Sequence, residues 1–149
     1  MSEEFKAIVR IAGVDLDGEK SIAYAIKGIK GVGIATAFAL CRKLNIDPYR
    51  KLGSLSDSEI KKLDDAIRNI SKLGFPYWFL NRPKDPETGE HLHLIGSDLV
   101  FRVKMDIELM KKIRSWKGIR HMYGLKVRGQ RTRTTGRTGM TVGVTRRKR

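Results

Sequence analysis

Apolar residues recur three or four positions apart in several stretches of the chain, and each stretch predicts a helix. The first predicted helix runs from about Glu19 to Lys27. The second covers residues 34–44, after a glycine-rich break at 28–33. A third begins after Ser56, because Ser56 and Glu59 have the spacing of a capping box, and it is expected to close at Gly74.

The last helix is expected from about Asp98 to Trp116, with Ser97 as its cap. Its acidic residues precede its basic ones, which is the order that the helix dipole favours. Residues 75–97 differ from the rest because they are rich in aromatic residues, proline and glycine. The turn sequence Pro-Glu-Thr-Gly at 86–89 lies between two more apolar segments, so we expect a small β-hairpin in this insertion. The pattern as a whole predicts a mainly α protein.

Charge divides the chain unequally. Residues 1–108 carry 17 basic and 16 acidic side chains, whereas residues 109–149 carry fourteen Lys and Arg and no Asp or Glu. We therefore expect a globular helical domain at 1–117, which contains the insertion at 75–97, and an extended basic tail at 118–149. Because like charges repel, such a tail stays extended unless a polyanion neutralises it, and RNA is the polyanion that this composition favours.

Small and hydroxyl-bearing residues separate several cations of the tail, so the protein backbone can approach RNA closely and the hydroxyls can donate hydrogen bonds to phosphate oxygens. A solvated basic tail without a ligand is the alternative. A membrane surface is disfavoured because the tail shows no amphipathic helical period, and no membrane partner is expected. The basic candidates for RNA binding are Lys126, Arg128, Arg131, Arg133, Arg137, Arg146, Arg147, Lys148 and Arg149.

The glycine-rich break at 28–33 is the best local motif. A helix, a turn with glycines at 31 and 33, and a second helix form the layout of a helix-hairpin-helix, whose turn amides and second helix bind phosphate without reading bases. If Gly31 and Gly33 present their amides to a phosphate, a side chain at either position is expected to clash or to require a positive φ. A plain tight turn between two helices is the alternative. The candidate phosphate-binding residues are Lys27, Lys30, Gly31, Val32 and Gly33.

Other chemistry finds little support in the sequence. No apolar run approaches the roughly 18–20 residues of a membrane span, and the N-terminus lacks the apolar segment of a signal peptide. The single Cys41 lies in an apolar stretch and is expected to be buried and structural, as in a reducing cytoplasm. His91 and His93 lack a third ligand at metal-like spacing, so no metal or cofactor is expected. No nucleophile–base pair stands out in the sequence, and no enzymatic activity is predicted.

Several segments together resemble a known family. They are IAGVDLDGEKSIAYAIKGIKGVG, the capped helix that follows, and above all HMYGLKVRGQRTRTTGRTGMTVGV, whose heptad Arg128–Thr134 is the most specific piece. These segments resemble the universal small-subunit ribosomal proteins of the thirteenth family. The stretch FPYWFLNRPKDPETG resembles the longer archaeal and eukaryotic branch of that family.

The resemblance implies a helix-two-turns-helix core followed by an extended tail, located in the head of the small subunit and bound to small-subunit ribosomal RNA. It implies two protein neighbours, the nineteenth small-subunit protein and, across an intersubunit bridge, the large-subunit protein that sits with the 5S RNA. It also implies that the tail approaches transfer RNA in the peptidyl site, and adds Gln130, Thr132 and Thr134 to the tail candidates. A helix-hairpin-helix DNA-binding or DNA-repair module is the alternative, although repair chemistry needs an amine nucleophile beside an acid, for which the sequence offers no clear candidate.

Overall fold

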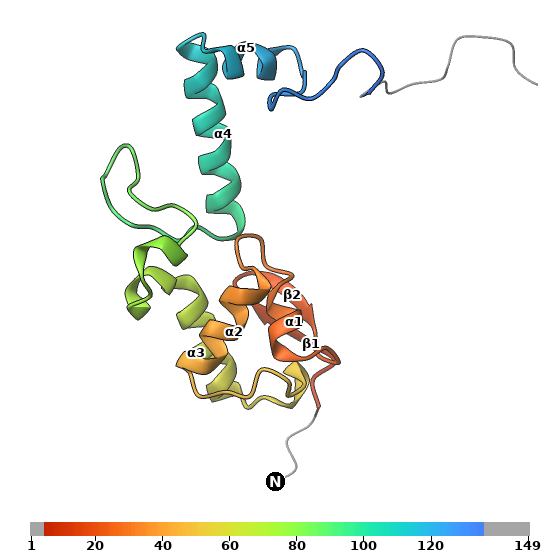
Figure 1. Ribbon diagram of the computed structural model, residues 1–149. Coiled ribbons are helices and arrows are strands. Elements are labelled where there is room, and N and C mark those ends of the chain that lie inside the picture. Colours follow the sequence, from red (N-terminus) through yellow and green to blue (C-terminus); the bar gives the residue numbers. More distant parts are fainter. Residues whose placement is uncertain (1–4, 136–149) are drawn as a thin grey trace, which may run out of the picture. The chain divides into compact units, whose positions relative to one another are not determined.

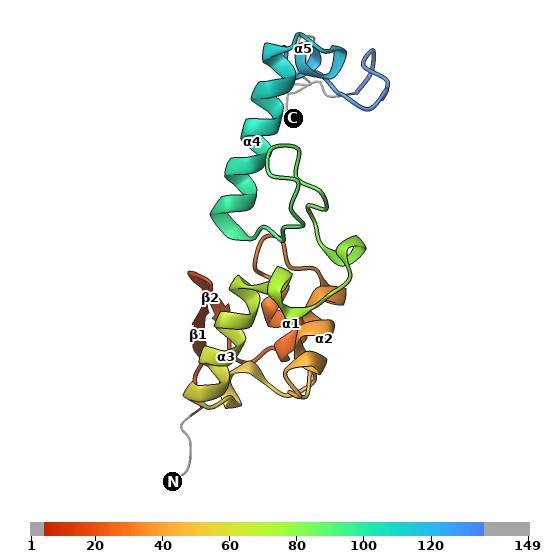
Figure 2. The same ribbon diagram turned by 90° about the vertical axis from the view of Figure 1, so that its left-hand side faces the viewer.

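The computed structural model describes residues 5–135, and within them the fold is mainly helical with a small two-stranded antiparallel sheet (Figures 1 and 2). The predicted mainly α fold class is confirmed. The trace divides into two compact units, Met1–Phe101 and Arg102–Arg149, and the division falls inside helix α4. The elements are β1 (Ile8–Ile11), β2 (Val14–Asp17), α1 (Ile22–Ile26), α2 (Ile34–Lys43), the 3-10 helix η1 (Leu52–Ser54), α3 (Asp57–Arg68), the 3-10 helices η2 (Ile70–Leu73) and η3 (Tyr77–Phe79), α4 (Gly96–Lys112) and α5 (Trp116–Met122).

The hairpin of β1 and β2 lies near the start of the chain, where the sequence pattern did not predict strands. Its two-residue loop, Ala12-Gly13, has φ values of 50° and 76°, as a type I′ turn requires. The amide of Ala12 donates to Oδ1 of Asp64 at 2.7 Å, so the turn is bonded to α3. Asp64 is half-buried on the polar face of α3, and this hydrogen bond gives it a structural role.

Helices α1 and α2 form the centre of the first unit, where small side chains allow the two helices to approach closely. Helix α1 starts at Ile22, three residues later than expected, and α2 matches its predicted range closely. Cys41 is buried, as predicted, and this burial raises the pKa of its thiol to about 11, with Asp47 as a smaller cause. The fully buried side chains of this core include Ile11, Ile22, Ile26, Ile29, Leu40, Cys41, Leu52, Leu55, Leu63, Ile67 and Ile70.

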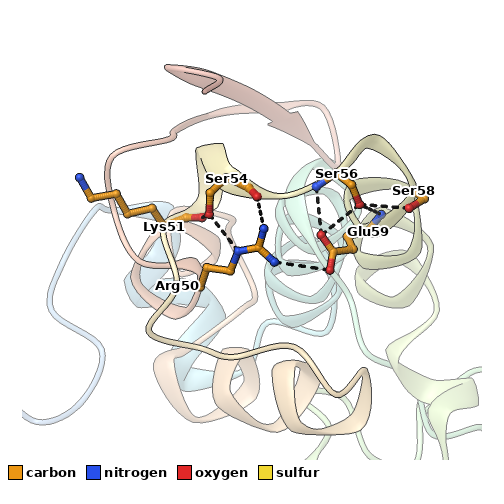
Figure 3. A network of polar contacts seen from close by, with 6 residues as sticks. All are labelled: Arg50, Lys51, Ser54, Ser56, Ser58 and Glu59. Atoms are coloured by element: carbon orange, nitrogen blue, oxygen red, sulfur yellow. Dashed lines mark hydrogen bonds and ion pairs between the residues drawn. The ribbon is translucent and has the colours of Figure 1, made fainter. Parts of the chain in front are cut away.

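The start of α3 confirms the capping box and adds a neighbour that the spacing alone did not show. The Glu59 amide donates to Ser56 Oγ at 3.3 Å, and the Ser56 amide donates to Glu59 Oε2 at 3.0 Å. Figure 3 shows Arg50 beside this box, where its guanidinium bonds Ser54 and lies 3.7 Å from Glu59 Oε1. The Ser56 amide lowers the pKa of Glu59, and Arg50 adds to this effect.

Helix α3 ends earlier than predicted. Its last residue is Arg68, and the shorter helix η2 continues the chain to Gly74, whose φ of 74° lies in the left-handed region. Gly74 therefore closes the helical segment, but as the end of a 3-10 turn.

The predicted β-hairpin within residues 75–97 is wrong in its strands. This segment contains η3 and a long loop, and between its two sides it has an isolated antiparallel bridge, Arg82 to Leu92, in place of paired strands. A buried carboxylate organises the loop instead: Asp85 is 1% exposed, pairs with Arg82 and accepts a hydrogen bond from Thr88 at 3.1 Å. The loop is thus held by hydrogen bonds to a buried polar group and not by paired strands. The alternation of apolar and polar residues does not reveal such a group.

The last predicted helix is two helices. Helix α4 ends at Lys112, the chain turns at Arg114 with a φ of 54°, and α5 begins at Trp116 with Ser115 as its N-cap. Ser97, predicted as a cap, lies inside α4. Gly118 is buried, and a Cβ there would lie 2.0 Å from the Met110 carbonyl oxygen, so only glycine allows α5 to pack against the end of α4. Among residues 5–135, no helix is both long and apolar enough to cross a membrane.

The capping box of α3 is testable by removing its hydroxyl. Ser56→Ala should lower the free energy of unfolding by about 0.5–2 kcal/mol, because the Glu59 amide is left without its acceptor. Ser97→Ala is the matched control and should change stability by less than about 0.5 kcal/mol, since Ser97 is exposed within a helix. Urea denaturation of both variants at neutral pH measures the difference. Equal losses of stability in the two variants would contradict the assignment of Ser56 as a cap and of Ser97 as a residue within a helix.

Candidate nucleic-acid interface

The turn between α1 and α2 is fixed in the core by its own apolar residues. Three amides of the turn donate to carbonyls three residues earlier: Gly28 to Ala25 at 2.9 Å, Ile29 to Ile26 at 2.9 Å and Val32 to Ile29 at 3.1 Å. The side chains of Ile29 and Val32 are buried in the core. The turn is therefore a rigid element, and the amide of Val32 is already used within it.

The amides at the N-terminus of α2 are better placed to bind an anion than the amide of Val32, which is already hydrogen-bonded. Gly33 is its N-cap residue, with no side-chain cap bond and no acidic residue in the first helical turn. Gly33 is exposed, and a Cβ built on it would meet nothing within 4 Å. Because the first amides of a helix have no intrahelical acceptor and lie at the positive end of its dipole, they suit a phosphate oxygen. The side chains of Lys27 and Lys30, on the same turn, are exposed.

The two glycines of the motif have different roles. Gly31 has a φ of 97°, and its Cβ would lie 2.4 Å from the Leu94 carbonyl oxygen, so the expectation of a backbone constraint is confirmed there. Gly33 has a φ of −88°, which any residue adopts, so a positive φ does not require glycine there. The absence of a side chain at Gly33 leaves open space beside the first turn of α2.

The insertion bonds directly to this turn, a contact that sequence reasoning missed. His93 Nε2 lies 3.0 Å from the Gly31 carbonyl oxygen, while the Asn81 amide donates to His93 Nδ1 at 3.4 Å. The neutral imidazole with its proton on Nε2 satisfies both bonds. Burial lowers the pKa of His93, and the bond to Gly31 acts in the opposite direction. The Gly96 amide also donates to the Lys30 carbonyl at 2.8 Å.

This arrangement gives both histidines of the His-x-His sequence structural roles. His91 accepts a hydrogen bond from the Lys84 amide at 3.1 Å, and its ring lies 5.4 Å from that of Tyr77. Within residues 5–135, no three His, Cys, Asp or Glu side chains are grouped as metal ligands. The alternation of the two histidines was visible in the sequence, but the partner of His93 lies 62 residues away in Gly31 and could not be read from it.

The second unit carries the described part of the basic tail. Helix α5 crosses the predicted boundary at residue 117, and after Tyr123 the chain to residue 135 forms no further helix or strand. The Leu125 amide donates to the Arg120 carbonyl at 2.9 Å, and the Arg120 side chain bonds the Lys126 carbonyl, so the start of the segment is held on α5.

The candidate side chains of this segment are all exposed, and none of residues 109–135 is acidic, so the segment has the positive charge and the accessible donors that a nucleic acid backbone requires. The exposed candidates are Lys126, Arg128, Gln130, Arg131, Thr132, Arg133 and Thr134. The remaining candidates, Arg137, Arg146, Arg147, Lys148 and Arg149, lie outside the described residues.

Comparison with known proteins points in one direction. A family model described as ribosomal protein S13/S18 matches residues 10–138. The chain is 63% identical over 148 residues to the small ribosomal subunit protein uS13 of Pyrobaculum calidifontis, covering 99% of this chain and 96% of that protein. It is 63% identical to the protein of the same name from Thermofilum pendens, covering 99% and 94%. With that of Aeropyrum pernix it is 59% identical over 140 residues, covering 94% and 93%.

The contact between the turn and the insertion generates a stability prediction. Gly31→Ala should lower the free energy of unfolding by about 2 kcal/mol or more, because the new Cβ meets the Leu94 carbonyl and the positive φ is strained. Gly33→Ala should lower it by less than about 1 kcal/mol, the difference expected between glycine and alanine at an N-cap. Equilibrium urea unfolding decides between them, and a Gly31→Ala variant as stable as Gly33→Ala would refute the contact.

Proposed function

Since the chain belongs to the ribosomal protein S13/S18 family, we propose that it is a structural constituent of the head of the small ribosomal subunit. We also propose that it binds small-subunit ribosomal RNA there. The observation that carries the RNA-binding role is the cationic segment from Lys111 to Arg133, which contains no carboxylate and exposes most of its basic side chains. Each phosphate that meets such a cation releases condensed counterions, which favours binding. The protein acts in the cytoplasm, in the ribosome, and without catalysis.

The first unit contributes a phosphate contact at the N-terminus of α2. Gly33 leaves space for a phosphate beside the uncapped amides, and the exposed Lys27 and Lys30 add positive charge on the same turn. Gly31 and Val32 hold the turn in place, through the contact with Leu94 and through the buried valine side chain. A backbone contact of this kind fixes the position of the protein on RNA without reading its sequence.

The second unit contributes the extended contacts. We propose that Lys126, Arg128, Gln130 and Arg131, with the residues that follow them, bind ribosomal RNA and approach transfer RNA in the peptidyl site. Two protein contacts complete the proposal, one with the nineteenth small-subunit protein and one with the large-subunit protein that sits with the 5S RNA, across an intersubunit bridge. The family resemblance supports these partners, and the alternative of a DNA-binding or DNA-repair module lacks such support.

The phosphate contact at α2 can be tested with a substitution that changes stability and binding in opposite directions. Gly33→Asp should raise the free energy of unfolding by a few tenths of a kcal/mol, because aspartate is a better N-cap than glycine. It should weaken RNA binding by about tenfold or more, since a hydrogen bond to a charged group contributes about 1.5–3 kcal/mol and the carboxylate occupies the phosphate position.

Gly33→Asn is the matched control for this substitution. It caps the helix without a negative charge, so it should stabilise the fold and weaken RNA binding less than aspartate does. Filter binding with a small-subunit ribosomal RNA fragment measures the affinities. If all three proteins bind RNA equally, the N-terminus of α2 is not a phosphate site.

The tail contacts predict a change in salt dependence. Replacing Arg128, Arg131 and Arg133 with serine should reduce the slope of log affinity against log salt by about 0.7–0.9 for each arginine that binds a phosphate. The control removes the same charge from the first unit by replacing Lys43, Lys61 and Lys72, all exposed, with serine, and should leave the slope nearly unchanged. Equal slopes for the two triple variants would show that binding depends on net charge alone.

The same tail variant tests the interaction with transfer RNA. Small subunits that contain the Arg128, Arg131 and Arg133 replacements should assemble, because the first unit and the remaining tail residues are unchanged. They should bind peptidyl-site transfer RNA more weakly, by on the order of 1 kcal/mol or less for each exposed arginine that is removed. Unchanged affinity of fully assembled subunits would exclude these three residues from the transfer-RNA interface.

A further inference from the structure

Helix α5 exposes a large aromatic side chain in the middle of the cationic segment. Trp116 is 71% exposed, although the indole is among the largest mainly apolar surfaces that a side chain offers. The residues around it in sequence include Arg114, Lys117 and Arg120, and no acidic residue follows Glu108. An exposed aromatic ring among cations is the combination that proteins use to bind single-stranded nucleic acid.

The indole is attached to a rigid part of the second unit. Ser115 caps α5 by accepting a hydrogen bond from the Gly118 amide at 3.2 Å, and its hydroxyl donates to the Met110 carbonyl at 3.0 Å. Gly118 is buried, and a Cβ added to it would lie 2.0 Å from the Met110 carbonyl oxygen, so glycine is required at this position. The first turn of α5 is therefore fixed against the end of α4, so binding a ligand on Trp116 does not require ordering the helix first.

Arg120 supports the ring from one side. It lies one helical turn after Trp116, and its guanidinium carbon is 5.6 Å from the centre of the indole ring, within the range of a cation–π contact. The guanidinium is itself held by its hydrogen bond to the Lys126 carbonyl. Because the indole has two faces and remains largely exposed, the guanidinium covers part of one face and leaves surface for a second flat group.

We propose that Trp116, supported by Arg120, stacks on an unpaired nucleobase of the bound RNA. This inference rests on the proposed function, since it adds a base contact to the phosphate contacts of the same unit. Charge complementarity favours RNA over a protein as the occupant, because the surrounding segment is cationic and has no carboxylate of its own. The base is unpaired, because bases inside an A-form duplex have their faces covered by their neighbours.

Affinity measurements separate this stacking contact from the charge contacts. Trp116→Leu in the full-length chain should weaken binding to oligoadenylate by about 5- to 150-fold. It should leave the slope of log affinity against log salt unchanged, because every phosphate-binding cation is retained. Trp116→Phe keeps a flat ring and should restore most of the affinity. Trp78→Leu is the matched control, since Trp78 is also 71% exposed but lies in the first unit.

Fluorescence gives a second reading that leaves Trp116 itself intact. The chain has two tryptophans, so Trp78→Phe leaves Trp116 as the single reporter and Trp116→Phe leaves Trp78. Oligoadenylate should quench the emission of Trp116, and a blunt RNA duplex should quench it much less. The emission of Trp78 should change little with either RNA.

The outcomes distinguish this inference from the proposed function. If oligoadenylate binds with a normal salt slope but neither quenches the emission of Trp116 nor depends on this residue, the stacking inference is overturned and RNA binding stands. If Trp116→Leu and Trp78→Leu weaken binding equally, the inference is also overturned. If the unmodified chain binds neither oligoadenylate nor ribosomal RNA, the proposed function fails.

Discussion

The close packing of α1 against α2 is the contact on which the rest of the first unit depends. Ala23, Ala37 and Cys41 are fully buried, and their small size lets two short helices pack closely. Because the helices are close, the turn between them is short, and it is held by the buried side chains of Ile29 and Val32. The start of α2 is thereby fixed at the surface with its first amides directed away from the helix, which is what a phosphate contact requires.

The insertion adds a second constraint to the same turn. Its loop is organised around the buried carboxylate of Asp85, and its far end bonds the turn through His93 and through the Gly96 amide. A buried carboxylate is stable only when its oxygens are paired, and here Arg82 and Thr88 provide the partners. The insertion thus acts as a support for the turn between α1 and α2, and the small space at Gly31 is what allows the two backbones to meet.

Charge segregation explains why the second unit differs from the first. The first unit has nearly balanced charge and buries a continuous apolar core, whereas the segment after Glu108 contains no Asp or Glu. Within residues 102–135 the only buried residue is Gly118, so this unit has little core of its own to bury. Its exposed apolar and cationic side chains suit a surface that an RNA covers, which is consistent with the family to which the chain belongs.

The sequence alone determined the features that depend on neighbouring residues: the presence of α1, the range of α2, the capping box at Ser56, the burial of Cys41 and the basic segment after Glu108. Helical periodicity, capping and charge runs involve residues only a few positions apart, so they can be recognised in one chain.

Tertiary structure decided the rest. The bond between Ala12 and Asp64 and the contact of Gly31 with His93 and Leu94 join residues more than fifty positions apart. The break at Arg114, where a non-glycine residue adopts a positive φ, depends on α5 packing against Met110. Such contacts form only when the chain has folded, because their partners are set by proximity in space and not by sequence separation.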